Sequence, residues 1–383
     1  MSTTTAPMDD PWQPRGSAKV TMKAVHRATA GHPWIYKSDI ESSPEVAGMV
    51  HVEGPGGRHL GWAMCSPRSQ ITLRLLSRRK SPIDRAFFVD RLSEAHQRRQ
   101  RLLPGIDAYR WVHGEADLLP GIFIDRYADK VVLQSTCEAA DHFEAAMIEM
   151  VDAQLAPKAI VVRNDAKTRA REGLRQHISV VKGDAPVLAR YREGNIELEV
   201  DLLADQKTGG FLDQSANHLR AAHYATGRAL DCFTYHGGFA LQLASVCDEV
   251  IGIDSSSAAI TRACANAARA KLSNVTFREA NAFDQLSELR RQEERFTTIV
   301  LDPPAFASGK DTLESASRAY KEINRQAMGL LHPHGILVTC SCSGRLTSKA
   351  FEEIDCCRPR CETPGSCART PARTRSSCAD GRA

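Results

Sequence analysis

One segment of this 383-residue chain, Asp302-Pro303-Pro304-Ala305-Phe306, combines residue types that could bind a nucleobase. It follows the apolar run TTIVL, whose composition is typical of a buried strand, and its two prolines restrict the backbone. Asp302 could therefore hydrogen-bond the edge of a base while Phe306 stacks on its face. This pairing suits a base that has been turned out of its helix, and we predict base contacts for Asp302, Pro303 and Phe306.

Two cysteines follow a second apolar run and could act as a nucleophile. Cys340 and Cys342 lie in the sequence CSCSG after GILVT, which would bring them to the same sheet edge as Asp302 if both runs are parallel strands. A thiolate there could add to C6 of a pyrimidine and make C5 nucleophilic enough to accept a methyl group. Cysteines at strand ends more often serve as small hydrophobic residues, so the thiols alone do not decide the chemistry.

A glycine-containing loop after the run RALDC could approach a nucleotide-like ligand. Its Gly237-Gly238 pair lets the backbone come close to a ligand at the carboxyl edge of a sheet. The loop lacks the full G-x-G-x-x-G pattern, which argues against a nicotinamide dinucleotide, and a plain strand-to-helix turn is the alternative. The residues that we predict to contact a cofactor here are Asp231, Phe233, Tyr235 and Gly237.

Two further strand ends carry polar side chains that suit an adenosine group. Asp254 ends the run EVIGID and could accept hydrogen bonds from both ribose hydroxyls. Asn281 follows VTFREA and, with Ala282 after it, could meet the adenine edge, because an amide both donates and accepts. A simple turn asparagine is an equally good interpretation of Asn281 by itself.

These loops need a parallel sheet to position them. From residue 228 onward, short apolar runs alternate with amphipathic stretches, as in RALDCF, FALQLASV, EVIGID, SSSAAITRACANAARAK, TTIVLD and GILVTC. Such a pattern indicates parallel strands whose two faces are covered by helices. We therefore predict an α/β fold in which a doubly wound, Rossmann-like domain carries the candidate site.

The N-terminal part is expected to be a small, basic β domain. Residues 19–80 contain strand-like runs broken by glycine-rich turns, and residues 82–101 have the apolar spacing of a bridging helix. Residues 1–101 hold 16 Lys and Arg against 9 Asp and Glu, a charge of +7, although the whole chain is only +4. Concentrated positive charge favours a polyanionic partner, but a solvated face is an equal alternative. The cations that we expect to contact RNA are Arg74, Arg78, Arg79 and Lys80.

The composition is that of a soluble protein. Hydrophobic residues make up 42% and charged residues 25%, and no stretch has the ~20 apolar residues that a membrane span requires. The N-terminus lacks the basic-then-apolar order of a secretory signal, so we expect a cytoplasmic protein whose 12 cysteines are reduced. Residues 110–200 read as an α+β unit whose task the sequence does not reveal.

Five ordered motifs together resemble those of the ribosomal large-subunit RNA methyltransferase I family. They are QKTGGFLDQ at 206–214, DCFTYHGGFALQLA, GIDSSSAAI, LDPPAFASGK and SCSG at 341–344, joined by HPWIYKSDI and SPRSQITLRLL nearer the N-terminus. The resemblance covers roughly residues 19–350. It implies an enzyme with a PUA domain that uses S-adenosylmethionine to methylate C5 of a cytosine in ribosomal RNA.

The resemblance also implies roles for individual residues. Cys342 matches the cysteine of the SCSG motif and would be the nucleophile, with Cys340 in reserve because TCS resembles the nucleophile motif of other RNA cytosine-5 enzymes. Asp302 would hold the N3/N4 edge of cytosine and Phe306 would stack on its ring, while the base that removes the C5 proton stays unassigned. The residues that would line or close the pocket are Gly237, Asp254, Asn281, Asp302, Lys207 and Phe211.

The expected domains are PUA-like at 19–80, a bridging helix and α+β domain at 81–204, a methyltransferase domain at 205–350 and an aberrant tail at 351–383. Residues 356–383 contain no Val, Ile, Leu, Met, Phe, Tyr or Trp and should be disordered. Because the family continues with a further helix and strands there, we expect an incomplete sheet and a less stable relative. Zinc binding by the tail cysteines is disfavoured, since their spacing fits no paired C-x-x-C site.

Other functions remain open at this point. The leading alternative is a methyltransferase that acts on a purine nitrogen of RNA and needs no thiol. A catalytically impaired RNA-binding protein is a second alternative, and an NAD-dependent oxidoreductase is the weakest. The oligomeric state is open, with a homodimer among the options.

Overall fold

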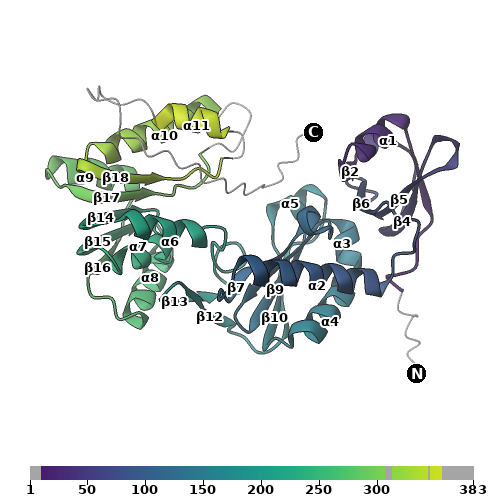
Figure 1. Ribbon diagram of the computed structural model, residues 1–383, viewed down its shortest axis with the longest axis horizontal. Helices are drawn as coiled ribbons and strands as arrows, with labels where there is room; N and C mark the ends of the chain where they lie inside the picture. Colours follow the sequence, from purple (N-terminus) through teal and green to yellow (C-terminus); the bar gives the residue numbers. More distant parts are fainter. Residues whose placement is uncertain (1–9, 307–312, 344–345, 356–383) are drawn as a thin grey trace. The chain divides into compact units, whose positions relative to one another are not determined.

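The computed structural model describes residues 10–306, 313–343 and 346–355. The residue contacts divide the chain into two units (Figure 1). The first unit runs to Arg192 and takes up the chain again at Val200–Leu212, whereas the second contains Glu193–Glu199 and continues from Asp213. The segment 356–383, for which we predicted disorder and considered zinc, lies outside the described residues. No helix in the described ranges is both long and apolar enough to cross a membrane.

The first unit begins with a six-stranded mixed sheet in the order β2-β6-β5-β4-β1-β3. We predicted strands and turns in this part, but the structure adds the helix α1. Its start follows from Thr21, whose side chain accepts a hydrogen bond from the backbone of Ala24, and its buried side is made of small residues. The elements are β1 (Ser17–Val20), α1 (Met22–Thr29), β2 (Trp34–Ile35), β3 (Ile40–Ser42), β4 (Gly48–Gly54), β5 (Arg58–Cys65) and β6 (Leu73–Ser77).

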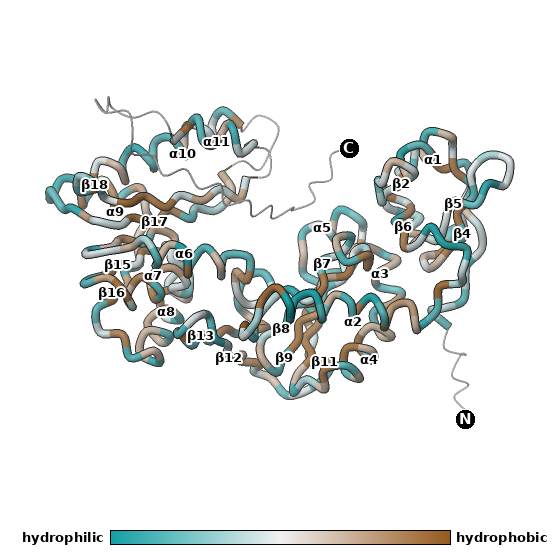
Figure 2. Tube along the Cα trace, viewed as in Figure 1, coloured by the Kyte–Doolittle hydropathy of each residue, from teal (hydrophilic) through white to brown (hydrophobic). Residues whose placement is uncertain are grey.

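A second sheet of the first unit has five strands in the order β11-β10-β9-β8-β7. The long helix α2, predicted from its apolar spacing, buries Phe88 and Leu92 in a core that also contains Met64 of the first sheet and Trp111 of β7. Figure 2 shows hydrophobic residues concentrated on the strands. The elements are α2 (Arg85–Leu102), β7 (Ala108–His113), β8 (Ile122–Tyr127), β9 (Lys130–Ser135), α3 (Glu138–His142), α4 (Glu144–Leu155), β10 (Ala159–Asn164), α5 (Lys167–Arg171) and β11 (His177–Lys182).

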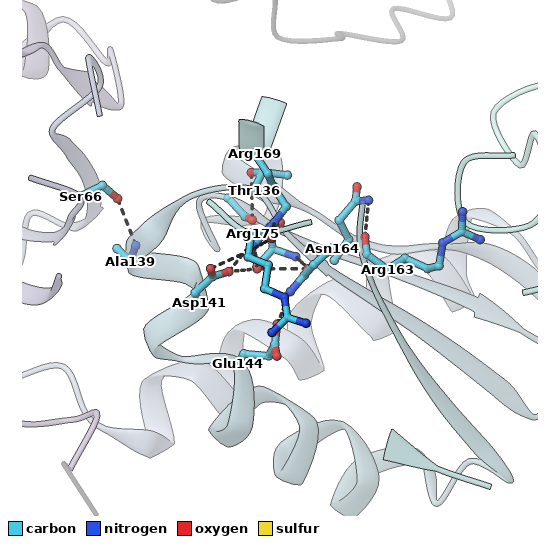
Figure 3. A network of polar contacts seen from close by, with 12 residues as sticks. Ser66, Thr136, Ala139, Asp141, Glu144, Arg163, Asn164, Arg169 and Arg175 are labelled. Atoms are coloured by element: carbon cyan, nitrogen blue, oxygen red, sulfur yellow. Dashed lines mark hydrogen bonds and ion pairs between the residues drawn. The ribbon is translucent and has the colours of Figure 1, made fainter. Parts of the chain in front are cut away.

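A buried polar network joins the ends of strands β9 and β10 to α5 (Figure 3). Arg169 is only 1% exposed, and its guanidinium group donates to both carboxylate oxygens of Asp141, at 2.6 and 2.9 Å. Asn164 accepts a hydrogen bond from the backbone of Ser135 at 2.8 Å. Because every charge in the network has a partner, it can be buried at tolerable cost and fixes the local fold.

Arg74, which we predicted to contact RNA, belongs to a second buried network instead. Its side chain is 7% exposed, and it donates to Glu172 Oε1 at 3.0 Å and to the carbonyl oxygen of Ile71 at 2.9 Å. The guanidinium group therefore lies inside the first unit, where RNA cannot reach it. Sequence position alone suggested a surface cation because the partner carboxylate lies far away along the chain.

We expect Arg74→Ala to lower the free energy of unfolding by about 3 kcal/mol, because it leaves the Glu172 carboxylate without its partner. Arg79→Ala is the matched control, since Arg79 is exposed and its loss should change stability by less than about 0.5 kcal/mol. Urea denaturation of the two variants makes the comparison. Equal stability of the two variants would contradict the structural role of Arg74.

A hairpin of β12 (Leu188–Glu193) and β13 (Ile196–Asp201) precedes the second unit's main sheet. That sheet has five parallel strands in the order β16-β15-β14-β17-β18, as the alternating pattern predicted. The elements are α6 (Ser215–Tyr224), β14 (Arg228–Cys232), α7 (Gly238–Ala244), β15 (Glu249–Asp254), α8 (Ser257–Arg269), β16 (Val275–Glu279), α9 (Ala282–Arg291), β17 (Phe296–Leu301), α10 (Leu313–Met328), β18 (Leu331–Thr339) and α11 (Ser348–Asp355).

Helices cover both faces of this parallel sheet (Figure 1). Leu230 of β14 packs in the core cluster that contains residues of α9 and α10, whereas its neighbour Ala229 packs against α6 and α7. Successive residues of a strand point to opposite faces, so two hydrophobic layers follow from one apolar run. The strand order reverses between β14 and β17, and the carboxyl ends of these two strands form the crevice where such sheets bind ligands. Among the described residues, β18 pairs with β17 alone.

Candidate active site

The loop after β14 turns sharply because several of its residues adopt left-handed backbone conformations. Phe233, Tyr235 and Gly237 have φ angles of 68°, 50° and 86°. Gly238, the second glycine of the pair, has a packing role: a Cβ atom there would lie 2.4 Å from Cε1 of His218 in α6. The loop is thus a strained turn whose left-handed φ angles a glycine adopts readily and the two aromatic residues do not.

Asp231, near the end of β14, holds the loop that follows this strand through hydrogen bonds. It is fully buried, and its Oδ2 atom accepts hydrogen bonds from Thr234 Oγ1 at 2.6 Å and from the backbone of Ala240 at 3.0 Å. Its Oδ1 atom is buried and has no hydrogen-bond partner among the described residues. Burial raises the pKa of Asp231 to about 7, against the lowering influence of the Thr234 hydroxyl and the charge of His218.

This raised pKa makes a prediction about stability. A carboxyl group whose pKa is higher in the folded state stabilises the fold in its protonated form, and this contribution is lost as pH rises to about 7. Asp231→Asn mimics the protonated form at every pH. Between pH 5 and 7 the wild type should therefore lose up to about 1.4 kcal/mol per pH unit of unfolding free energy relative to the variant. Denaturation at several pH values tests this, and a difference that does not vary with pH would contradict it.

Asp254 connects the ends of two neighbouring strands. Its Oδ2 atom accepts a hydrogen bond from the backbone of Tyr235, and its Oδ1 atom accepts one from the backbone of Ser256, both at 2.9 Å. The side chain is partly exposed, and each carboxylate oxygen can accept a further hydrogen bond. Asp254 can therefore hold the glycine loop and still accept hydrogen bonds from a ligand.

Asn281 serves as the N-cap of α9, which supports the structural interpretation of this residue. Its Oδ1 atom accepts hydrogen bonds from the backbones of Phe283 at 2.9 Å and Asp284 at 3.4 Å. The Asn281 side chain is exposed, whereas Ala282 is buried in the core beneath it. The capping role occupies the carbonyl oxygen, so the amide nitrogen is the atom of Asn281 better placed to meet a ligand.

The DPPAF segment lies directly beyond β17. The backbone of Asp302 donates to the carbonyl oxygen of Cys232 at 3.4 Å, which places the ends of β17 and β14 side by side. Pro303 is buried, so its ring is not available to a substrate. The Phe306 ring packs edge-on against Tyr320, with 4.8 Å between ring centroids. Of the predicted base contacts, Asp302 and Phe306 remain partly exposed and Pro303 does not.

The two candidate cysteines occupy different environments. Cys342 is exposed, and its thiol donates to the carbonyl oxygen of Pro303 at 3.6 Å, which brings it next to Asp302. Cys340 is largely buried, and both burial and the charge of Asp302 raise the pKa of its thiol. Because the thiolate is the reactive form, Cys342 is the better placed of the two for nucleophilic attack.

The remaining predicted residues belong to the first unit, which is described by itself. There the Lys207 ammonium lies 4.1 Å from the centre of the Phe211 ring. Arg78, Arg79 and Lys80 are all exposed, and Arg78 donates to the carbonyl oxygen of Ala28 in α1. Sequence reasoning did not single out Gln214, which donates to Asp302 at 2.8 Å, although it ends the quoted motif QKTGGFLDQ.

Comparison with known proteins agrees with this arrangement. A model of PUA-like domains matches residues 18–78, and a model of methyltransferase domains matches residues 225–368. The crystal structure of SMU.776 complexed with SAH superposes with a TM-score of 0.74 at 19% identity, covering 88% of this chain and 89% of that one, which shows a common fold.

Two relatives named ribosomal RNA large subunit methyltransferase I share much of the sequence. The protein of Tolumonas auensis is 39% identical over 336 residues, which are 84% of each chain. The protein of Erwinia tasmaniensis is 39% identical over 334 residues, again 84% of each chain. At this identity and coverage, the chain described here belongs to the ribosomal RNA large subunit methyltransferase I family.

Proposed function

We propose that this chain transfers a methyl group from S-adenosylmethionine to C5 of a cytosine in large-subunit ribosomal RNA, with Cys342 as the nucleophile. The observation that carries the proposal is the position of the Cys342 thiol. It is exposed at the carboxyl edge of the sheet, against the residue that follows Asp302. The alternative nucleophile Cys340 is less exposed, and burial and the charge of Asp302 raise the pKa of its thiol.

The residues at the carboxyl ends of β14 and β15 fit an adenosine-type cofactor. Asp231 offers a buried carboxylate oxygen without a partner among the described residues, and Asp254 has lone pairs left for ribose hydroxyls. Between these two carboxylates the backbone turns at Gly237, which has a left-handed conformation and no side chain. A ligand could therefore come close to the backbone there. When bound, S-adenosylmethionine supplies an electrophilic methyl group.

In the proposed reaction, the Cys342 thiolate forms a bond with C6 of cytosine, and the electron pair of the C5–C6 double bond moves toward C5. Carbon 5 would then bond to the methyl group as the bond between that carbon and the sulfonium sulfur breaks, which would leave S-adenosylhomocysteine. Removal of the C5 proton by a base returns the electron pair to the ring, and the bond from C6 to Cys342 breaks. Asp302 would hold the N4 amino group of the base, and Phe306 would contact its face.

The exposed cations after β6 would bind the RNA backbone. Replacing Arg79 and Lys80 with alanine should weaken RNA binding most at low salt, because fewer counterions are released. The magnitude of the slope of log affinity against log salt concentration should fall by about 1.4, given roughly 0.7 for each of two phosphate contacts on a single strand. Arg325→Ala is the matched control, since this exposed cation is paired with Glu322 in α10 and should leave the slope unchanged. The slope is measured by RNA-binding assays at several salt concentrations. An unchanged slope in the double variant would show that Arg79 and Lys80 do not contact the RNA backbone.

Nucleoside analysis tests the proposed function. The purified protein is incubated with methyl-labelled S-adenosylmethionine and large-subunit RNA from cells that lack the gene, and the RNA is digested to nucleosides for mass spectrometry. We expect label in 5-methylcytidine. Label on a purine nitrogen would establish the alternative chemistry that needs no thiol, and binding of RNA without binding of S-adenosylmethionine would indicate a catalytically impaired relative.

A further inference from the structure

Gln214 connects the start of α6 to the end of β17. It is the residue before the first turn of α6, yet its side chain does not cap that helix. Instead, Nε2 donates to Asp302 Oδ2 at 2.8 Å. Glutamine is not among the residues favoured at an N-cap, so helix capping does not explain its presence here.

The orientation of the Gln214 amide is set by its two partners. A carboxylate only accepts hydrogen bonds, so the nitrogen of Gln214 must face Asp302. The amide oxygen then faces Asn217, whose Nδ2 donates to Gln214 Oε1 at 2.5 Å. Asn217 lies one turn further along α6, where the helix holds it rigidly. Asn217 therefore donates to Gln214, and Gln214 donates to Asp302. The amide of Gln214 cannot turn over without losing both hydrogen bonds.

Gln214 also influences Cys340 at the end of β18, where it lowers the pKa of the thiol against the larger, raising effect of burial. Cys340 stands two residues before the proposed nucleophile Cys342. The hydrogen bond to Asp302 joins the start of α6 to the strand end that carries the proposed base-binding acid. Such a group can fix the carboxylate relative to the reacting base without itself touching that base.

We propose that Gln214 is a positioning residue that holds Asp302 as a hydrogen-bond acceptor toward the pyrimidine and thereby selects cytosine over uracil. This inference rests on the proposed function, in which Asp302 receives the base edge. A cytosine presents an N4 amino donor where uracil presents an O4 acceptor. A carboxylate that accepts from Gln214 can also accept from N4, because each carboxylate oxygen has two lone pairs.

Without Gln214, the carboxyl group of Asp302 can rotate or bind a proton. A protonated carboxyl group can donate to O4 of uracil, so discrimination between the two bases should weaken. Loss of a hydrogen bond to a charged group should also cost the cytosine reaction about 10- to 100-fold. A positioning role therefore predicts two linked changes, a slower reaction and a relaxed choice of base.

The test compares Gln214→Ala and Gln214→Glu with the wild type, using Gln326→Ala as the control. Gln326 is on α10, and its side chain contacts Glu322 of the same helix. Rates are measured on matched RNAs with cytosine or uracil at the methylated position, together with S-adenosylmethionine affinity and thermal stability. For Gln214→Ala we expect kcat on cytosine RNA to fall by about 30-fold and the preference for cytosine by at least about 10-fold. Gln326→Ala should match the wild type.

Gln214→Glu adds a readout that a structural role alone would not give. Two facing carboxyl groups can share one proton and keep their hydrogen bond at low pH, but they repel when both are ionised. Activity of this variant should therefore approach the wild type at the acidic end of the profile and fall as pH rises. The other titratable groups around Asp302 are common to all variants, namely His218, Asp231, Tyr320, Cys340 and Cys342.

The outcomes separate this inference from the proposed function. A wild type that makes no 5-methylcytidine would overturn the proposed function itself. A wild type that makes 5-methylcytidine, with the base preference and pH profile unchanged in the Gln214 variants, would overturn only the role of Gln214. If Gln214→Ala does not fold, the pH profile of Gln214→Glu decides, because that variant preserves the size of the side chain.

Discussion

Cys342→Ala is expected to reduce methyl transfer by at least about 10³-fold, because alanine cannot form the bond to C6 that makes C5 reactive. The affinity for S-adenosylmethionine should change little, since Cys342 lies beside the DPPAF segment and not beside Asp231 or Asp254. Turnover on large-subunit RNA and equilibrium dialysis with labelled cofactor measure the two quantities separately.

Two other cysteines provide the controls for this variant. Cys264 is exposed on α8, so Cys264→Ala tests the general effect of removing a surface thiol. Cys340→Ala tests the reserve nucleophile, and its buried thiol should contribute to packing more than to the reaction. Full turnover by Cys342→Ala would contradict the assignment of Cys342 as the nucleophile. Loss of turnover in Cys340→Ala alone would contradict it as well.

Asp254→Ala is expected to weaken S-adenosylmethionine binding by about 100-fold. The substitution removes the acceptor that we propose for the ribose, and charged hydrogen bonds of this kind contribute about 1.5–3 kcal/mol each. It also releases the backbones of Tyr235 and Ser256, which hold the glycine loop and the first turn of α8. Asp254→Asn should have a smaller effect, because the amide oxygen keeps one acceptor.

Asp248 provides a matched control for this second prediction. It is exposed and precedes β15, so it lies at the opposite edge of the sheet from Asp254. Asp248→Ala should leave cofactor affinity unchanged within about twofold, as expected for a surface substitution away from the site. If Asp248→Ala and Asp254→Ala bind S-adenosylmethionine with equal affinity, Asp254 does not contact the cofactor.

The parallel sheet was predictable because it depends on local pattern. Apolar runs of five or six residues define β14, β15 and β17, and the rule that ligands bind at carboxyl ends of such strands identified the loops after them. Asp254 is the last residue of β15, and Asp302 follows β17 directly. The family motifs then added roles that the pattern alone left open.

Side-chain contacts between distant parts of the chain were not predictable. Arg74 was predicted to face RNA, but Glu172 binds it inside the first unit. Gln214 was not singled out, because its contact depends on which strand end lies beside α6. The sequence left two interpretations of Asn281 open, and the structure shows its N-cap contacts. The helix α1 was missed because one capping threonine and a short amphipathic stretch gave little signal among strands. Periodicity does not encode such pairings, so the structure was needed to find them.

The most direct test of the central claim is to trap the covalent complex. In RNA with 5-fluorocytosine at the methylated position, no proton can leave C5 after methyl transfer, so the bond from C6 to the protein should persist. The account predicts a protein–RNA species that survives denaturation, with the nucleotide attached to Cys342 in peptide mass spectrometry. Methylation of ordinary RNA without any trapped species, or a nucleotide attached to Cys340, would contradict it.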